Sequence, residues 1–175
     1  ILAASRDLIK ENGWAAVSIR AVASRCSVSA GTIYNYYESK ADLLSDTIES
    51  IWHEIFFHPE DEQIFHDVES CISWIYERLE YGNRQFPGFF SLHSFGFMRD
   101  EKTSGKKRMM KTWGHILNGL CEVLENDPKV RADVFDQEFT EKKFADILFS
   151  LILVSMIRQD YDPSSVLMLV KKTLY

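Results

Sequence analysis

The side chains best suited to a chemical task lie in residues 18–40, which read SIRAVASRCSVSAGTIYNYYESK. Their spacing fits two short helices that meet at a turn over Cys26, Ser27 and Val28. This is the spacing of a helix-turn-helix, in which the second helix can enter the major groove of DNA. The segment therefore predicts a DNA-reading element.

The second helix, expected over 29–36, has no acidic residue, and its outward positions are small or hydroxylated. Gly31 allows the backbone to approach DNA closely, and Thr32 offers a hydroxyl and a methyl group to base edges. The tyrosine hydroxyls can donate to phosphate oxygens, and Lys40 adds a cation at the start of the next helix. The candidate DNA contacts are Ser18, Ser29, Ala30, Gly31, Thr32, Tyr34, Asn35, Tyr36 and Lys40.

The elements that position these residues are helices, because apolar residues recur at helical spacing along almost all of the chain. No Asn-Gly or Asp-Gly hairpin signal is present, and eight Gly and four Pro favour long helices over many short strands. We expect an all-α fold of about nine helices. The expected helices cover 1–11, a short stretch after Ser18, 29–36, 39–57, 61–81, 108–125, 138–159 and 164–174. A phenylalanine-rich segment, 86–98, lies between the helices expected over 61–81 and 108–125.

Local signals mark several helix ends. Asn12-Gly13 is a typical C-terminal stop, and Ser18 and Ser29 can cap the two helices that follow. Ser39 and Asp42 form a capping box, whose carboxylate can reach back to the free N–H groups at the helix start.

Charge divides the chain into two parts. Residues 1–46 hold five basic and five acidic side chains, whereas residues 47–175 hold the remaining 15 basic and 21 acidic ones and so all of the net charge of −6. That acidic balance argues against non-specific coating of nucleic acid, but a neutral head can still approach phosphate, because binding depends on the charge near the site. We expect a DNA-binding domain over 1–46 and a separate body over 47–175.

Residues 1–46 resemble the N-terminal domain of TetR-family transcriptional regulators. Part of that family's pattern, Val-Ser-x-Gly-Thr-x-Tyr followed by Lys and Leu, is matched by Val28, Ser29, Gly31, Thr32, Tyr34, Lys40 and Leu43, while Tyr37 replaces the usual Phe. The resemblance implies a helix-turn-helix head of three helices on a larger helical body. This implies that residues 47–175 form an effector-binding and dimerisation domain, whose effector is a small-molecule inducer.

The chain departs from the family pattern at two positions. Ser27 stands where the turn usually has Gly, so it must adopt a left-handed conformation at a cost of roughly 1 kcal/mol. Ala30 stands where Lys or Arg is common, which removes one cation from the reading helix. Taken alone, a serine-capped helix with three tyrosines is more often a packing element, but the flanking helices and the whole match favour DNA binding.

Aromatic residues of the body are candidates for an effector pocket. Trp74 and Tyr81 are seven residues apart and therefore lie on one flank of their helix. No convergent charges near them indicate a strongly ionic ligand, and ordinary core packing is the alternative for each residue. The candidate pocket residues are Trp52, Phe56, Trp74, Tyr81, Phe89, Phe90 and Trp113.

The last two expected helices carry more apolar surface than one subunit of this size can easily bury. From Ala145 to Ile157 only Asp146, Ser150 and Ser155 are polar, whereas a surface helix shows one charged face. Pairing both helices with their copies across a two-fold axis would cover this surface, so we expect a homodimer. The expected interface lies within about 140–175 and includes Leu151, Val154, Leu167 and Val170.

Other site classes have little support. The five histidines and three cysteines show no metal-ligand spacing, and no nucleophile elbow, P-loop or dinucleotide fingerprint is present. The basic run at 102–111 is typical of a solvated loop and helix start, with an anion contact as the alternative. We therefore expect no metal, no cofactor and no enzymatic activity.

Cellular location follows from two further patterns. The longest apolar run is far shorter than the roughly 20 residues of a membrane span. The odd, widely spaced cysteines are typical of a reducing compartment, so we expect a cytoplasmic protein. The chain opens at Ile1 inside a helical pattern, so we expect further N-terminal residues before this numbering.

Taken together, the residues and the resemblance predict a ligand-responsive DNA-binding regulator. The expected form is a repressor that a small apolar or aromatic molecule releases from double-stranded operator DNA containing an inverted repeat. One alternative is a helical interaction protein of the same fold that no longer binds DNA, which Ser27 and Ala30 would support. An all-α enzyme is the other alternative, although no paired acid and base is present.

Overall fold

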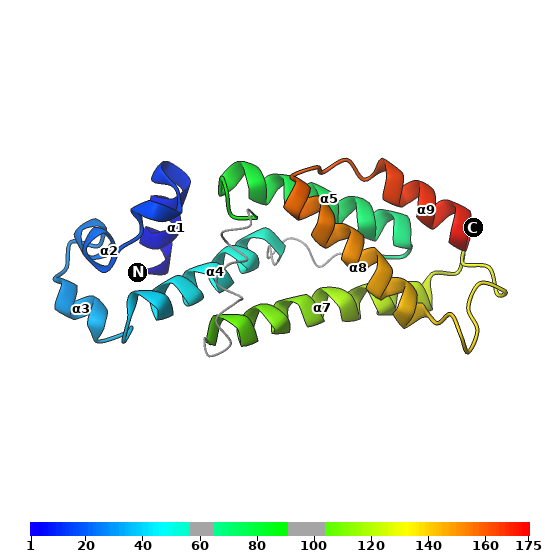
Figure 1. Cartoon of the computed structure of the whole chain (residues 1–175), viewed down its shortest axis with the longest axis horizontal. Helices are drawn as coiled ribbons and strands as arrows, with labels where there is room; N and C mark the ends of the chain where they lie inside the picture. The colour runs from blue at the N-terminus through cyan, green and yellow to red at the C-terminus, as the bar shows by residue number, and fades with distance from the viewer. Residues whose placement is uncertain (57–64, 91–103) are drawn as a thin grey trace. The chain divides into compact units, whose positions relative to one another are not determined.

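The computed structural model describes residues 1–56, 65–90 and 104–175, with side chains from 113 onward in the last range. This part of the chain contains eight α-helices, one short 3₁₀ helix (η1, Trp14–Ala16) and no strand (Figure 1). The α-helices are α1 (Leu2–Asn12), α2 (Ile19–Arg25), α3 (Ala30–Tyr34), α4 (Lys40–Phe56), α5 (Val68–Gln85), α7 (Ser104–Asn126), α8 (Glu141–Arg158) and α9 (Ser164–Leu174). The all-α prediction is confirmed, and the count is near the expected nine.

The chain packs as two compact units. Unit 1 comprises residues 1–58 and 81–110, and unit 2 comprises residues 59–80 and 111–175. Unit 1 thus contains the expected head together with all of α4. The functional boundary expected after residue 46 stays a prediction.

The first helices of unit 1 begin and end at the residues that the sequence indicated. α1 stops at Gly13, whose φ of +73° is readily adopted by glycine, and the Gly13 N–H donates to the carbonyl of Ile9 at 2.9 Å. Ser18 caps α2 by accepting from the Ala21 N–H at 3.1 Å. The capping box differs in detail, because the Asp42 carboxylate accepts from the Ser39 hydroxyl at 2.8 Å.

The core of unit 1 has an aliphatic and an aromatic part. Val17, Val22, Ile33 and Leu43 have no exposed area and hold the three head helices against the start of α4. Around Trp52, further along α4, four rings pack at centroid distances between 5.1 and 5.9 Å; they belong to Trp14, Trp52, Phe89 and Phe90.

Gly82 permits close packing between the end of α5 and α4. A Cβ at this position would lie 2.6 Å from the Ile55 Cδ1 atom and 3.0 Å from the Phe90 ring. No side chain larger than hydrogen fits there without displacing these neighbours. The phenylalanines of residues 86–90 are buried, and these residues form a turn. Residues 91–98 of the expected phenylalanine-rich segment lie outside the described residues.

Unit 2 is built from α5, α7, α8 and α9. Its buried residues recur at helical spacing, as the sequence predicted. Between α5 and α8, the hydroxyl oxygens of Tyr76 and Ser155 lie 2.9 Å apart. Fully or almost fully buried residues include Val68, Ile72, Leu79, Leu120, Leu124, Leu148, Ile152, Val170 and Leu174. No helix within the described ranges is long and apolar enough to cross a membrane.

Candidate nucleic-acid interface

The turn between α2 and α3 depends on a left-handed residue. Ser27 has φ of +56°, as the sequence predicted from the glycine that usually stands there. Two hydrogen bonds close the end of α2: the Ser27 N–H donates to the Ser24 carbonyl at 3.1 Å, and the Val28 N–H donates to the Ala23 carbonyl at 2.9 Å. These bonds end α2 and form a short turn, so that α3 begins within a few residues of the end of α2.

The short helix α3 has one buried residue that packs in the core and a solvent-exposed face. It spans five residues, which is shorter than the expected 29–36, and ends with Asn35 as its C-cap. Ile33 has no exposed area and anchors the helix in the core of unit 1. Tyr34 and Tyr36 are 56% and 71% exposed, which is unusual for tyrosine and leaves both hydroxyls accessible to a partner.

Two of the candidate DNA-contacting residues, Ser29 and Thr32, form the N-terminal cap of α3. Ser29 accepts from the Thr32 N–H at 3.2 Å, and the two side-chain hydroxyls lie 3.0 Å apart. Gly31 is exposed, and Ala30 is half-buried at the first position of the helix. Ser18 is half-buried and serves as the cap of α2. Thr32 keeps its methyl group and one hydroxyl lone pair for a base edge.

Three of the five cations of the head are engaged in ion pairs. The Arg6 Nε and Lys10 Nζ atoms on α1 lie 2.9 and 2.7 Å from the two carboxylate oxygens of Glu54 on α4. Arg25 binds the Glu11 carboxylate through both guanidinium Nη atoms, with one contact at 2.6 Å. This hydrogen-bonded pair raises the pKa of Arg25 and lowers that of Glu11.

Arg20 and Lys40 are the remaining cations of the head. Both are exposed, and neither makes an ion pair with another residue in the described part of the chain. Lys40 was a candidate from the sequence, whereas Arg20 was missed. The position of Arg20 in the sequence could have indicated a phosphate contact. It is the second residue of α2, next to the capped helix start, where the first helical N–H groups also favour anions.

The structure brings some of the candidate pocket residues together and separates others by unit. Trp52, Phe56, Phe89 and Phe90 are buried in unit 1, where Trp52 contacts each of the other three rings. Tyr81 also belongs to unit 1, whereas Trp74 and Trp113 belong to unit 2. In unit 2, the ring centroids of Trp74 and Phe65 lie 5.2 Å apart, and those of Trp113 and Phe149 lie 5.8 Å apart. Their role in effector binding stays a prediction.

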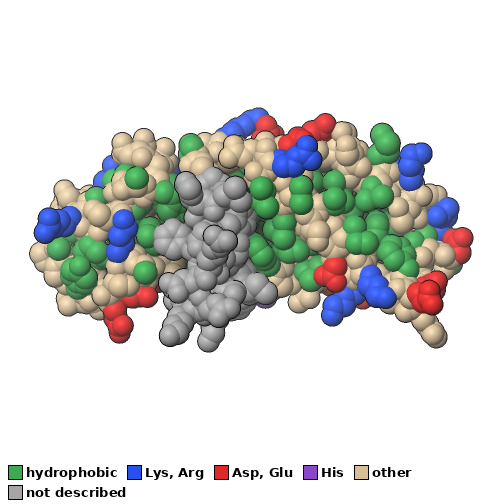
Figure 2. Space-filling model, in the orientation of Figure 1, with side chains coloured by type: hydrophobic (Ala, Val, Ile, Leu, Met, Phe, Trp, Pro, Cys, Tyr) green, Lys and Arg blue, Asp and Glu red, His purple; other side chains and the backbone are tan. Residues whose placement is uncertain are grey.

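The candidate dimer residues differ in their exposure. Val154 is 45% exposed, and Leu151 and Leu167 are partly exposed. Val170 has no exposed area, because it faces inward with Val166 and Leu174, so its assignment to the interface was wrong. Figure 2 shows apolar side chains gathered over α8 and α9. The large exposed apolar residues of these helices are Ile147, Val154, Ile157, Met168 and Leu169.

Comparison with known proteins agrees with this geometry. Residues 1–47 match the model of a family described as bacterial regulatory proteins, tetR family. The transcriptional regulator UidR of Escherichia coli K12 is 38% identical to this chain over 48 residues, which cover 27% of this chain and 24% of UidR. The match therefore spans about a quarter of the length of that relative.

Solved structures extend the likeness to the whole chain. FadR from Bacillus subtilis, in complex with stearoyl-CoA, has a TM-score of 0.66 at 19% identity and is matched over 99% of this chain and 97% of its own. GusR from Salmonella enterica has a TM-score of 0.61 at 18% identity, over 98% and 92%. The fold is that of these helical proteins, and residues 1–47 are similar in sequence to the N-terminal part of TetR-family regulators.

Proposed function

We propose that this protein is a ligand-responsive DNA-binding transcriptional regulator that binds an inverted repeat through α2 and α3. The observation that carries the proposal is the exposed surface of α3 and of the residues directly after it, where Tyr34 and Tyr36 are open to solvent and Ile33 is the one buried residue of the helix. Such a helix has too little buried area to be explained by packing. The family match over residues 1–47 supports the same reading.

The candidate residues divide into two roles. Thr32, Gly31 and Asn35 face the base edges, where a methyl group, a bare backbone and an amide can distinguish base pairs. Tyr34, Tyr36, Lys40 and Arg20 contact phosphates, which fixes the position of the head on the duplex. Contacts of the first kind determine sequence preference, and contacts of the second kind determine overall affinity and its dependence on salt.

The regulator acts as a homodimer in this proposal. Leu151, Val154 and Leu167 meet their copies across a two-fold axis, with Met168 and Leu169 completing the apolar surface of α8 and α9. A symmetric dimer presents two copies of α3 to two half-sites about 34–36 Å apart, one turn of DNA.

A small apolar or aromatic molecule is the proposed effector, and we propose that it releases the protein from DNA. The support is chemical and comparative: the body is rich in aromatic residues, and the similar fold of FadR was solved with stearoyl-CoA. An effector of this kind lowers operator affinity if it binds more tightly to a conformation whose heads do not fit both half-sites. Because operator DNA is the proposed partner, the proposed location is the cytoplasm.

An electrophoretic mobility-shift experiment with the DNA upstream of the protein's own gene tests this function. The wild-type protein should shift that DNA in the presence of excess unrelated DNA. Lys40→Ala should weaken the shift several-fold and lower the slope of log affinity against log salt by about one. The matched control is Lys142→Ala, which removes an exposed lysine of unit 2 and should bind like wild type. A wild-type protein that shifts no DNA at low salt would favour the helical interaction protein.

A further inference from the structure

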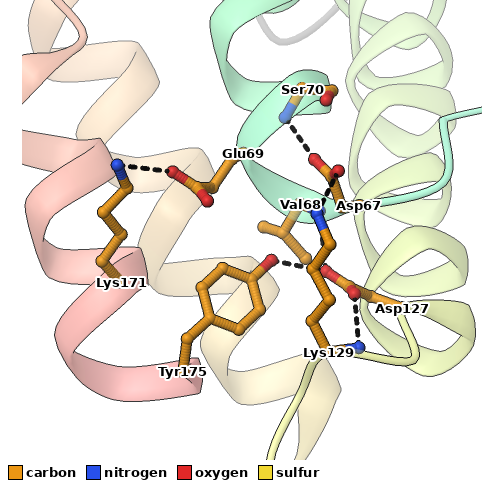
Figure 3. Close-up of polar contacts among 8 residues, drawn as sticks. All are labelled: Asp67, Val68, Glu69, Ser70, Asp127, Lys129, Lys171 and Tyr175. Atoms are coloured by element: carbon orange, nitrogen blue, oxygen red, sulfur yellow. Dashed lines mark hydrogen bonds and ion pairs between the residues drawn. The ribbon is translucent and has the colours of Figure 1, made fainter.

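A buried carboxylate joins three separate elements of unit 2. Asp127, directly after α7, is 6% exposed, and its carboxylate accepts hydrogen bonds from three donors (Figure 3). These are the Val68 N–H at 3.0 Å, the Lys129 N–H at 2.9 Å and the Tyr175 hydroxyl. They belong to the first residue of α5, the loop after α7 and the residue after α9. We call this arrangement the Asp127 clamp.

The loop after α7 also caps the end of α9. The Arg131 N–H donates to the Leu174 carbonyl at 2.9 Å, and the Arg131 guanidinium donates to the Thr173 carbonyl at 3.0 Å. The last carbonyls of a helix have no partner inside it, so these bonds satisfy groups that would otherwise depend on water. The end of α9 is therefore tied to the loop through both its backbone and Tyr175.

A second, more exposed layer surrounds the clamp. Asp67 accepts from the Ser70 N–H at 2.8 Å and from the Lys129 Nζ at 2.9 Å. Lys171 on α9 lies 3.0 Å from Glu69 on α5. The Lys129 and Lys171 side chains are 60% and 61% exposed, so water screens both pairs and each contributes little. The buried Asp127 is thus the stronger link between α9 and the rest of unit 2.

α9 needs such a link to hold its position. The helix has 11 residues, and isolated helices shorter than about 12–15 residues are marginal in water. Its inward stripe of Val166, Val170 and Leu174 fixes which face is buried. Apolar contacts alone allow small shifts along and around the axis, whereas hydrogen bonds to a buried carboxylate are directional and costly to break.

We propose that the Asp127 clamp positions α9 for pairing with a second copy of the chain, which makes Asp127 and Tyr175 positioning residues for dimerisation. The inference rests on the proposed homodimer. The outward face of α9 carries Met168, which is 58% exposed, and Leu169, which is 38% exposed. In a two-fold interface a displaced α9 misplaces these side chains twice, once from each copy.

Tyr175→Phe is the mildest test, because it removes one hydroxyl and keeps the ring. Its dimer dissociation constant, measured by sedimentation equilibrium, should be about tenfold higher than that of wild type, since the lost bond is to a charged acceptor. Helical content should be unchanged, and amide hydrogen exchange should accelerate in residues 164–174. Asp127→Asn should act in the same direction and more strongly, because an amide nitrogen cannot accept from the donors of the carboxylate.

Lys171→Ala is the matched control, since it removes an exposed ion pair of the same helix and should change the dissociation constant by less than about threefold. If wild type and Tyr175→Phe have equal dissociation constants while α9 exchanges faster, the clamp stabilises the fold alone and the proposal is wrong. If wild type is itself a monomer at micromolar concentration, the proposed dimer fails, and the role of the clamp fails with it.

Discussion

Ser27 shows how one residue of the turn adopts a conformation that its side chain disfavours. Its left-handed φ of +56° was expected from the glycine that the family pattern has there, and the two backbone hydrogen bonds at the end of α2 hold it. A residue with a Cβ in this conformation loses about 1–2 kcal/mol relative to its right-handed form. The turn forms nevertheless, because the packing of α2 and α3 around Ile33 outweighs that cost.

Ser27→Gly should stabilise the protein, because glycine adopts a left-handed φ without the steric cost. The gain should be about 0.5 kcal/mol, since the greater freedom of glycine in the unfolded chain offsets part of the relief. Ser24→Gly, in the interior of α2, is the control and should destabilise by about 1 kcal/mol or less. Urea unfolding measures both changes, and equal losses in the two variants would contradict the account of the turn.

Arg20 and Arg25 make a matched pair of arginines on α2. Arg25 is engaged with Glu11, whereas Arg20 makes no ion pair with another described residue. Arg20→Ala should therefore weaken binding to all DNA sequences several-fold and reduce the salt slope by about one, while Arg25→Ala should leave the slope nearly unchanged. Fluorescence anisotropy with labelled DNA at several salt concentrations gives both values. Equal effects of the two substitutions would show that the ion pairs do not determine which cation reaches phosphate.

At the scale of the elements, the sequence predicted what local signals determine. Caps at Ser18 and Ser29 and the stop at Gly13 depend on residues within one turn of each other, and the structure has all three. α5 was expected from residue 61 but starts at Val68, where Asp67 accepts from the Ser70 N–H and Asp127 accepts from the Val68 N–H. Residues 61–64 of the expected range lie outside the described residues. The Asp127 clamp could not be predicted from local patterns, since two of its three donors, on Val68 and Tyr175, lie 59 and 48 residues away.

Asp67 at the start of α5 predicts a pH dependence. The hydrogen bond from Lys129, assisted by Ser70, lowers the pKa of Asp67 to about 2 from its ordinary value of 3.8. A carboxylate with a lowered folded-state pKa contributes stability above its unfolded pKa and loses it as the pH falls through the folded value. Wild type should thus be more stable than Asp67→Asn at pH 7, and the difference should shrink between about pH 4 and pH 2.

Urea unfolding of the two proteins across that range checks this prediction. Asp133→Asn is a suitable control, since the Asp133 carboxylate is 84% exposed and has only a 3.9 Å contact with Arg131. A difference between wild type and Asp67→Asn that stays constant down to pH 2 would mean that Asp67 does not act through its charge.

For the whole molecule, the proposed function depends on two chains that bind DNA together. The sequence predicted the all-α fold, because helical periodicity depends on residues close together in the chain. It also predicted that α8 and α9 carry excess apolar surface, because the apolar residues of each segment can be counted. It assigned Val170 to the wrong side, because α9 is apolar around most of its circumference and only packing reveals which stripe is buried. The ring that packs on Trp113 could not be predicted either, because Phe149 is distant from it in sequence.

Val154→Arg should convert the protein to monomers. The substitution places a charge at a position that is 45% exposed in the single chain and covered in the proposed dimer, so two uncompensated charges would be buried per interface. The dimer dissociation constant should rise by at least about a hundredfold, with helical content retained and operator affinity lost. Sedimentation equilibrium and circular dichroism check the two parts, and dimers of wild-type affinity would place the interface elsewhere.

Hydroxyl-radical footprinting on the DNA upstream of the protein's gene tests the central claim most directly. The account predicts two protected patches, related by two-fold symmetry and about one helical turn (roughly 34–36 Å) apart. Each should be lost when Tyr34 at the end of α3 and Tyr36 just after it are both changed to Ala. Protection that persists in this double variant, or no protection of any upstream DNA by the wild-type dimer, would contradict the assignment of α3 as the DNA-reading helix.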